Sequence, residues 1–126
     1  MRYAFSQEWT ERARQVAQEL GFAHIVSGRV YCILSQGSKT KRTIARIHGL
    51  PKALQVGAGL SPLYVIELVS EKFLRQSPED RLRTLIHELM HVPHNFGGGF
   101  RHHKHYVSHR QVEEMYQQYV AHRQPA

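Results

Sequence analysis

What this sequence has little of already narrows its class. Its single cysteine, Cys32, cannot form an internal disulfide, and its apolar surroundings predict a small side chain in the core. There is no run of about 18 apolar residues, which argues against a membrane-spanning helix. Residues 1–20 carry too many charges for a signal peptide. We therefore expect a cytoplasmic protein that does not contact a membrane.

Acidic residues are also scarce relative to basic ones. The chain has 10 Asp and Glu against 17 Lys and Arg, which gives a formal net charge of +7. This charge favours acidic partners, non-specifically bound nucleic acid among them. With 126 residues, 41% of them hydrophobic, the chain is long enough for one core. We expect a single domain over residues 1–126, and a monomer.

The stretch that carries chemistry contains the sequence HELMH. His87 and His91 are four residues apart, and Glu88 directly follows the first of them. On an α-helix, residues i and i+4 lie on the same face, so both imidazoles can bind one metal ion. Glu88 is rotated by about 100° from His87, so it can act on a metal-bound water instead. This HExxH arrangement is typical of zinc peptidases.

The surrounding residues predict the helix that the motif requires. Ser77 is a favourable N-cap, Pro78 suits the first helical position, and two acidic residues follow in the first turn. Apolar residues then recur at helical spacing and predict a stripe that faces the core, with both histidines projecting away from it. The stripe comprises Leu82, Leu85, Ile86, Leu89 and Met90. Because Val92 precedes Pro93, we expect the helix to end there.

Two other helices are predicted beside a small sheet. Apolar spacing marks residues 6–20, and a last helix opens at His102 or His103. The stripe of the last helix comprises Val112, Met115, Tyr116, Tyr119 and Val120. Strand-forming residues dominate 22–26, 29–35, 40–48 and 64–69. A short helical turn is expected at 51–56.

A turn signal at residues 36–39 joins 29–35 and 40–48 into an antiparallel hairpin. Its tip is basic through Lys39, Lys41 and Arg42, which makes it a candidate nucleic-acid contact, although most such tips are merely solvated. The strand at 64–69 directly precedes the motif helix. Its backbone could bind an extended peptide substrate as an added strand.

A catalytic zinc site has three protein ligands and an open position for water. The histidines downstream of the motif are the candidates for the third ligand, and a carboxylate such as Glu113 is the alternative. These histidines are His94, His102, His103, His105 and His109. His94 follows His91 so closely that little chain remains to turn back, whereas the glycines at 97–99 allow a return over the helix. Because adjacent residues point in different directions, His102 and His103 are not expected to ligate together.

Residues 87–107, HELMHVPHNFGGGFRHHKHYV, preceded by YVIELVSEKF, resemble the predicted metallopeptidases of archaea and phages, distant relatives of the SprT-like (Spartan-type) zinc peptidases. The family pattern HELxHIPxxFxGGxRxH ends on the third-ligand histidine, which falls on His103. The resemblance covers roughly residues 28–107. It implies a zincin-like α+β fold: a twisted, mostly antiparallel sheet of three to four strands, an N-terminal helix, the HExxH helix, and a C-terminal helix bearing the third ligand.

The leading hypothesis is a zinc-dependent metallopeptidase acting on polypeptides. Zn²⁺ is held by His87, His91 and His103. Glu88 takes a proton from the attacking water and passes it to the leaving amine. Tyr106 and Arg101 are candidates for stabilising the oxyanion.

The alternative hypothesis is a non-catalytic, metal-stabilised module that binds nucleic acid through its basic surface. A fourth histidine, such as His94 or His105, would then close the coordination sphere. Glu88 separates the two hypotheses, because a purely structural metal site has no need of a general base.

Overall fold

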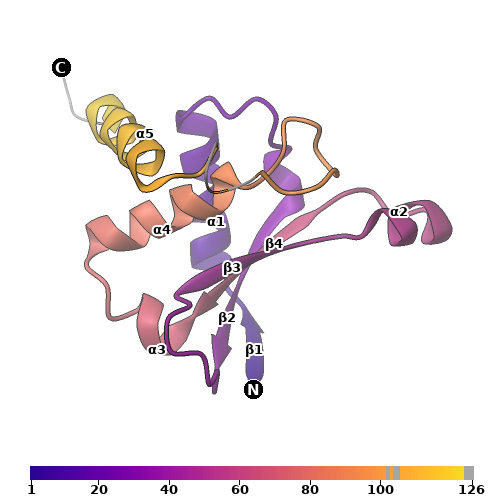
Figure 1. The fold of residues 1–126 in the computed structure, drawn as a ribbon, viewed down its shortest axis with the longest axis horizontal. Coiled ribbons are helices and arrows are strands. Elements are labelled where there is room, and N and C mark those ends of the chain that lie inside the picture. The colour runs from indigo at the N-terminus through magenta and orange to yellow at the C-terminus, as the bar shows by residue number, and fades with distance from the viewer. Residues whose placement is uncertain (102, 104–105, 124–126) are drawn as a thin grey trace.

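A computed structural model describes residues 1–101, 103 and 106–123 (Figure 1). Its centre is a four-stranded sheet in the order β1-β2-β4-β3. The strands are β1 (Arg2–Phe5), β2 (Val30–Gln36), β3 (Ala45–Gly49) and β4 (Tyr64–Val69). The helices are α1 (Gln7–Glu19), α2 (Lys52–Ala58), α3 (Ser70–Phe73), α4 (Pro78–Met90) and α5 (His109–Arg123), with a 3-10 turn at Ser27–Arg29.

The mixed α and β composition and the mostly antiparallel sheet are confirmed. β1 pairs with β2 and β3 with β4 in antiparallel fashion, whereas β2 and β4 are parallel. Helices α1, α2 and α4 match the segments expected from the sequence. Within the ranges that the structure describes, no helix combines the length and the apolar character needed to cross a membrane.

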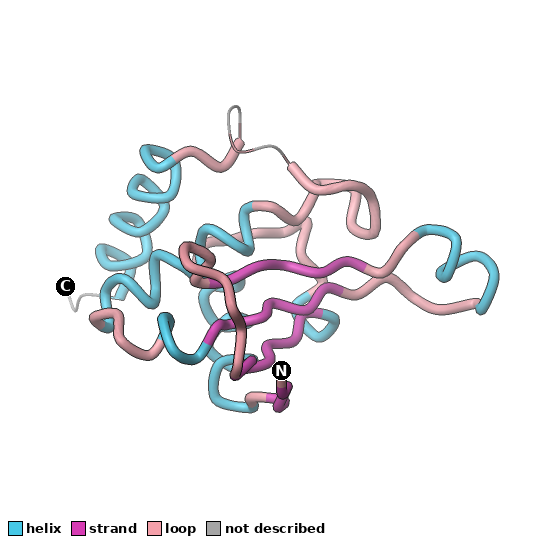
Figure 2. Tube along the Cα trace, turned by 60° about the horizontal axis from the view of Figure 1, so that its bottom comes forward, coloured by secondary structure: helices cyan, strands magenta, loops and turns pink. Residues whose placement is uncertain are grey.

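The expected hairpin of residues 29–35 and 40–48 is wrong. Strands β2 and β3 form there, but β4 lies between them and pairs with both. β4 takes this central position because five of its six residues are buried, and an apolar strand is stabilised most when it is covered on both edges. The basic segment 37–44 instead connects β2 to β3 around the end of β4 (Figure 2).

Two further expectations are wrong, namely a strand at residues 22–26 and the start of the last helix. Residues 22–26 form turns instead of a strand, because the amide of Phe22 bonds the carbonyl of Ala17 and closes the end of α1. The last helix begins at His109, not at His102 or His103. Ser108 and Gln111 fix this start, since each side chain accepts a hydrogen bond from the other residue's amide. Strand β1 was not expected from the sequence.

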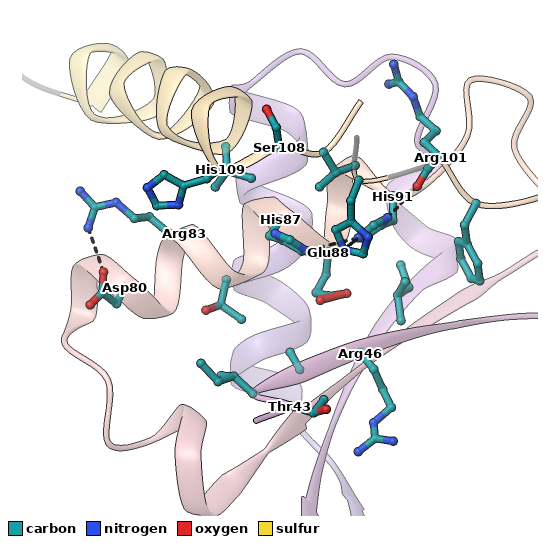
Figure 3. A pocket seen from close by; sticks show the side chains of 18 of the residues that line it. Thr43, Arg46, Asp80, Arg83, His87, Glu88, His91, Arg101, Ser108 and His109 are labelled. Atoms are coloured by element: carbon teal, nitrogen blue, oxygen red, sulfur yellow. Dashed lines mark hydrogen bonds and ion pairs between the residues drawn. The ribbon is translucent and has the colours of Figure 1, made fainter. Parts of the chain in front are cut away.

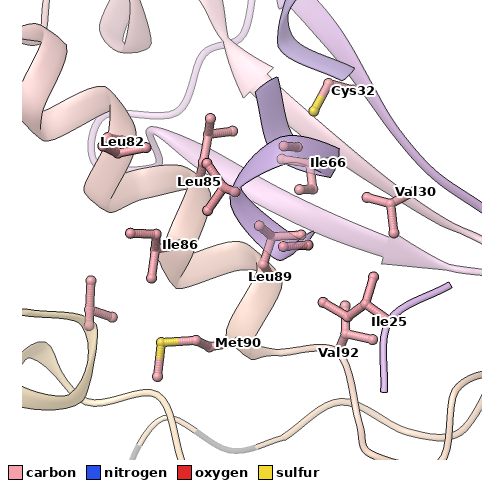
Figure 4. Close-up of a cluster of buried hydrophobic side chains, with 14 of the residues drawn as sticks. Ile25, Val30, Cys32, Ile66, Leu82, Leu85, Ile86, Leu89, Met90 and Val92 are labelled. Carbon is pink, nitrogen blue, oxygen red and sulfur yellow. The ribbon is translucent and has the colours of Figure 1, made fainter. Parts of the chain in front are cut away.

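Helix α4 begins as expected. The Ser77 hydroxyl accepts a hydrogen bond from the amide of Asp80 at 3.1 Å, and Pro78 occupies the first turn. Every residue of the expected apolar stripe is buried in the core (Figure 4). Cys32 lies in the same core, and burial raises the pKa of its thiol to about 12. Its predicted role as a small core side chain is confirmed.

The loop that follows α4 is fixed by Tyr64 of β4. The Tyr64 hydroxyl accepts a hydrogen bond from the amide of Gly97 and donates one to the carbonyl of Gly98, both at 3.0 Å. Gln55 of α2 donates to the carbonyl of Gly97 at 3.2 Å. Gly97 has a φ of +100°, and a Cβ there would lie 2.8 Å from Cγ of Pro62. This turn therefore requires glycine at 97.

Replacing Gly97 with alanine should destabilise the protein, and it should also weaken any metal binding that requires the loop after α4. The positive φ strains any L side chain by about 1–3 kcal/mol, and the clash with Pro62 adds to that strain. Thermal unfolding and zinc affinity by chelator competition measure the two effects. Gly99→Ala is the matched control, because a Cβ at 99 meets nothing within 4 Å. Equal behaviour of the two variants would show that the turn does not depend on glycine at 97.

Candidate metal centre

Three histidines from two segments converge at the C-terminal end of α4. His87 and His91 come from α4 and its C-cap, and His103 comes from the return loop. Their Nε2 atoms lie 3.3 Å (His87–His103), 3.2 Å (His87–His91) and 3.1 Å (His91–His103) apart. Ligand atoms of a tetrahedral zinc site lie about 3.3 Å from one another, given metal–nitrogen bonds of about 2.0–2.1 Å. These three residues could therefore hold a metal ion.

Arg101 orients one of the ligands through its main chain. Nδ1 of His91 lies 2.8 Å from the carbonyl oxygen of Arg101, and the amide of Arg101 donates to the carbonyl of His91 at 2.9 Å. Because a carbonyl oxygen only accepts, Nδ1 carries the proton and Nε2 keeps its lone pair. The same pair of bonds holds the return loop two residues before His103.

Burial sets the protonation of the cluster. It lowers the pKa of His87 to about 4, helped by the neighbouring His91 and His103, and it also lowers the pKa of His91. Both shifts favour the neutral rings of His87 and His91 at pH 7, which is the form that binds metal. Glu88 is only 6% exposed, and burial raises the pKa of its carboxyl group to about 7. A carboxylate of this kind can both accept and return a proton near neutral pH.

The cluster opens on a cavity of about 1120 Å³. Its walls are α4, strand β3 with the segment before it, and residues of the return loop and α5, namely 100, 101, 103, 107–109, 112 and 113. Figure 3 shows His87, Glu88 and His91 together on α4, with the Glu88 carboxylate pointing toward the side where β3 lies. The structure thus brings the three histidines and Glu88 to one surface of the cavity.

The strand expected to bind substrate has no free edge. β4 is flanked by β2 and β3 along its length, so it cannot accept another strand, and that expectation is wrong. β3 is the edge strand beside the cavity, and residues 45–47 line it. The sequence could not show this, because it depends on which strand lies between which.

The Arg101 guanidinium is directed away from the histidine cluster. It lies 2.9 Å from Nε2 of His94 and 4.4 Å from the centre of the Tyr106 ring. His94 also stacks on His24, with ring centres 4.7 Å apart, so it is not part of the metal cluster. His109 lines the cavity from the first turn of α5. The other candidates, His102 and His105, lie outside the described residues.

Arg83 is a residue of this cavity that the sequence did not single out. It contacts Asp80 at 3.0 Å and Glu113 of α5 at 2.8 Å, and its guanidinium lies 4.0 Å from the centre of the Tyr116 ring. These contacts hold α5 against α4. Hydrogen bonding to Glu113 raises the pKa of Arg83, and the same contact lowers the pKa of Glu113.

A comparison with protein-family models gives one result over almost the whole chain. The model described as "Putative phage metallopeptidase" matches residues 1–123, which include α4, the return loop and α5. No curated protein and no solved structure matches the chain. The resemblance to phage metallopeptidases is confirmed, and the wider relation to archaeal and SprT-like proteins stays a prediction.

Removing any one ligand should abolish stoichiometric zinc binding. His87→Ala, His91→Ala and His103→Ala each remove one of three nitrogen ligands and with it a large share of the binding free energy. Metal analysis of the purified variants and zinc titration measure the loss. His122→Ala is a neutral control, and His94→Ala tests the alternative ligand. Full zinc occupancy in His103→Ala, or its loss in His94→Ala, would contradict the assignment.

Proposed function

Because the chain belongs to the putative phage metallopeptidase family, we propose that it is a zinc-dependent peptidase that hydrolyses polypeptides. The observation that carries this proposal is the convergence of three imidazole nitrogens, 3.1–3.3 Å apart, on a cavity that Glu88 also lines. Three imidazoles in tetrahedral spacing suit zinc and leave one position open.

Bound zinc would lower the pKa of a water molecule toward neutrality and polarise the scissile carbonyl. Glu88 accepts the proton of the attacking water and delivers it to the leaving amine. Burial suits Glu88 to both steps, since it raises the pKa of the carboxyl group to about 7. Glu88 follows His87 on α4, so the helix that presents two ligands also positions the base.

The free edge of β3 supports a binding mode for an extended peptide. The carbonyl of Ile44 accepts a hydrogen bond from the amide of Val69 in β4, at 2.9 Å. Since successive residues of a strand direct their backbone groups to opposite edges, Arg46 also faces β4. The backbone groups of Ala45 and Ile47 then face the cavity side. A substrate paired with them would run along α4 past the histidines.

Oxyanion stabilisation by Tyr106 or Arg101 stays a prediction. The Arg101 side chain contacts His94 and the Tyr106 ring, so this role requires it to turn toward the cavity.

The alternative, a closed structural metal site, needs a fourth protein ligand. His94 instead contacts Arg101 and stacks on His24, and His105 lies outside the described residues. The buried Glu88 beside the open position also favours the peptidase.

Replacing Glu88 with glutamine should abolish proteolysis and leave zinc binding intact. The amide cannot accept the proton of the attacking water, so the rate of casein or peptide hydrolysis should fall by about 10²–10⁴-fold. Glu114→Gln, the same change at an exposed position of α5, is the control. Unchanged hydrolysis by zinc-loaded Glu88→Gln would exclude Glu88 as the general base.

Changing Ala45 to proline should weaken peptide binding while the fold is kept. Proline removes an amide donor that faces the cavity, and it is tolerated at the start of an edge strand. We expect kcat/KM for extended peptides to fall by about fivefold, the effect of one lost hydrogen bond. Ala45→Ser, which keeps the amide, is the control. A loss equal in both variants would place the peptide elsewhere in the cavity.

A further inference from the structure

The sheet has one face covered by helices and an open face, which is exposed along β1 and β3 but buried at Ser35, Glu67 and Val69. Side chains alternate along each strand, and those of Cys32, Ile66 and Ile47 belong to the core beneath α1 and α4. The residues between them face the other way. Figure 2 looks onto this second face, where β2, β4 and β3 lie in front of the helices and segment 37–44 crosses one end.

Three aromatic side chains gather on the β1–β2 half of the open face. Tyr3 and Phe5 are two residues apart on β1, so their side chains leave the same face of the sheet about 7 Å apart. Each is 61% exposed. Phe5 is paired with Ile33 of β2, which places Tyr31, two residues earlier, on the same face. In many proteins that bind single-stranded nucleic acid, unpaired bases stack on aromatic rings exposed on a sheet.

The β3 half of this face carries an ion pair, and the remaining cations lie around it. Arg46 and His48 of β3 share this face with Glu67, the one acidic residue in the four described strands. Glu67 is buried and compensated, because its Oε1 lies 2.9 Å from Nε2 of His48 and 3.6 Å from Nε of Arg46. Arg14 adds a guanidinium 5.0 Å from the centre of the Tyr31 ring. Arg46 therefore offsets the charge of Glu67, and the cations that remain beside this face are Arg14 and the exposed Lys39, Lys41 and Arg42.

We propose that this open sheet face binds single-stranded nucleic acid, with bases on Tyr3, Phe5 and Tyr31 and phosphates beside Arg14 and Arg46. Charge complementarity favours a polyanion over a second copy of this chain, because two such faces would oppose cations to cations at a net charge of +7. Exposed Lys39, Lys41 and Arg42 in segment 37–44 extend the positive charge at one end of the face.

The aromatic part of the proposed surface is separate from the metal centre, although Arg46 also lines the metal cavity. The histidine cluster lies on α4, on the helix-covered side of the sheet, whereas the aromatic residues lie on the opposite face. Nucleic-acid binding therefore does not depend on the peptidase proposal, and each can fail alone. Glu88→Gln should bind oligonucleotide as the unaltered chain does.

Fluorescence anisotropy of the zinc-loaded protein tests the proposal with a labelled oligo(dT) of about 20 nucleotides, a length that exceeds one binding module. We expect tighter binding of the single strand than of a duplex of the same length. The double variant Tyr3→Ala/Phe5→Ala should weaken single-strand binding by about tenfold or more, since each ring loses a stacked base. Leu54→Ala/Val56→Ala, on α2 with side chains 50% and 75% exposed, is the matched control.

Ultraviolet crosslinking keeps the test decisive if the double variant folds poorly, as circular dichroism would reveal. Oligo(dT) adducts on peptides that contain residues 2–5 or 30–36 support the proposal. Adducts confined to residues 39–42, equal binding of duplex and single strand, or no binding at low salt would overturn it. So would a dimer that depends on Tyr3 and Phe5 without oligonucleotide binding, because the face would then be a self-association surface.

Discussion

Two hydrogen bonds between His91 and Arg101 are the constraint on which the metal centre depends. One joins their main chains, and the other joins the His91 ring to the Arg101 carbonyl. Together they fix the tautomer of a ligand and the position of the loop that supplies the third histidine. A helix alone presents two imidazoles. The third imidazole, that of His103, comes from the loop that follows α4 and turns back over the helix. Tyr64 and Gly97 hold this loop in place.

The features of the site that could be predicted from the sequence all lie close together in the chain. The cap at Ser77, the apolar stripe and the i, i+4 histidines all belong to one helix, where side-chain direction follows from spacing. His103 came from the family pattern, and the structure places its ring beside the other two. The start of α5 was missed although the sequence contained its signal. Ser108 and Gln111 have the spacing of a capping box. The predicted start at His102 or His103 is too early because it was placed on the histidines that precede this box.

What could not be predicted depends on strand order. Residues 29–35 and 40–48 have the composition and the turn of a hairpin, and both strands exist, but the more apolar β4 lies between them. Because β4 lies between β2 and β3, the free edge of the sheet belongs to β3 and not to β4. β3 is therefore the strand to which an extended substrate could add. The hydroxyl of Tyr64, the amide of Gln55 and the guanidinium of Arg83 likewise act on residues at least 30 positions away, a distance at which spacing carries no information.

A strand with one free edge beside an open cavity also carries a risk of aggregation. β3 exposes backbone donors and acceptors that another copy of the chain could pair with, and sheet edges of this kind initiate aggregation when they are long, flat and apolar. This edge is none of these. It has five residues, contains Arg46 and His48, ends at Gly49 and follows the basic segment 37–44. Charge and brevity oppose pairing with a second copy of the protein, yet they would leave the edge open to a single extended peptide, as the proposed binding mode requires.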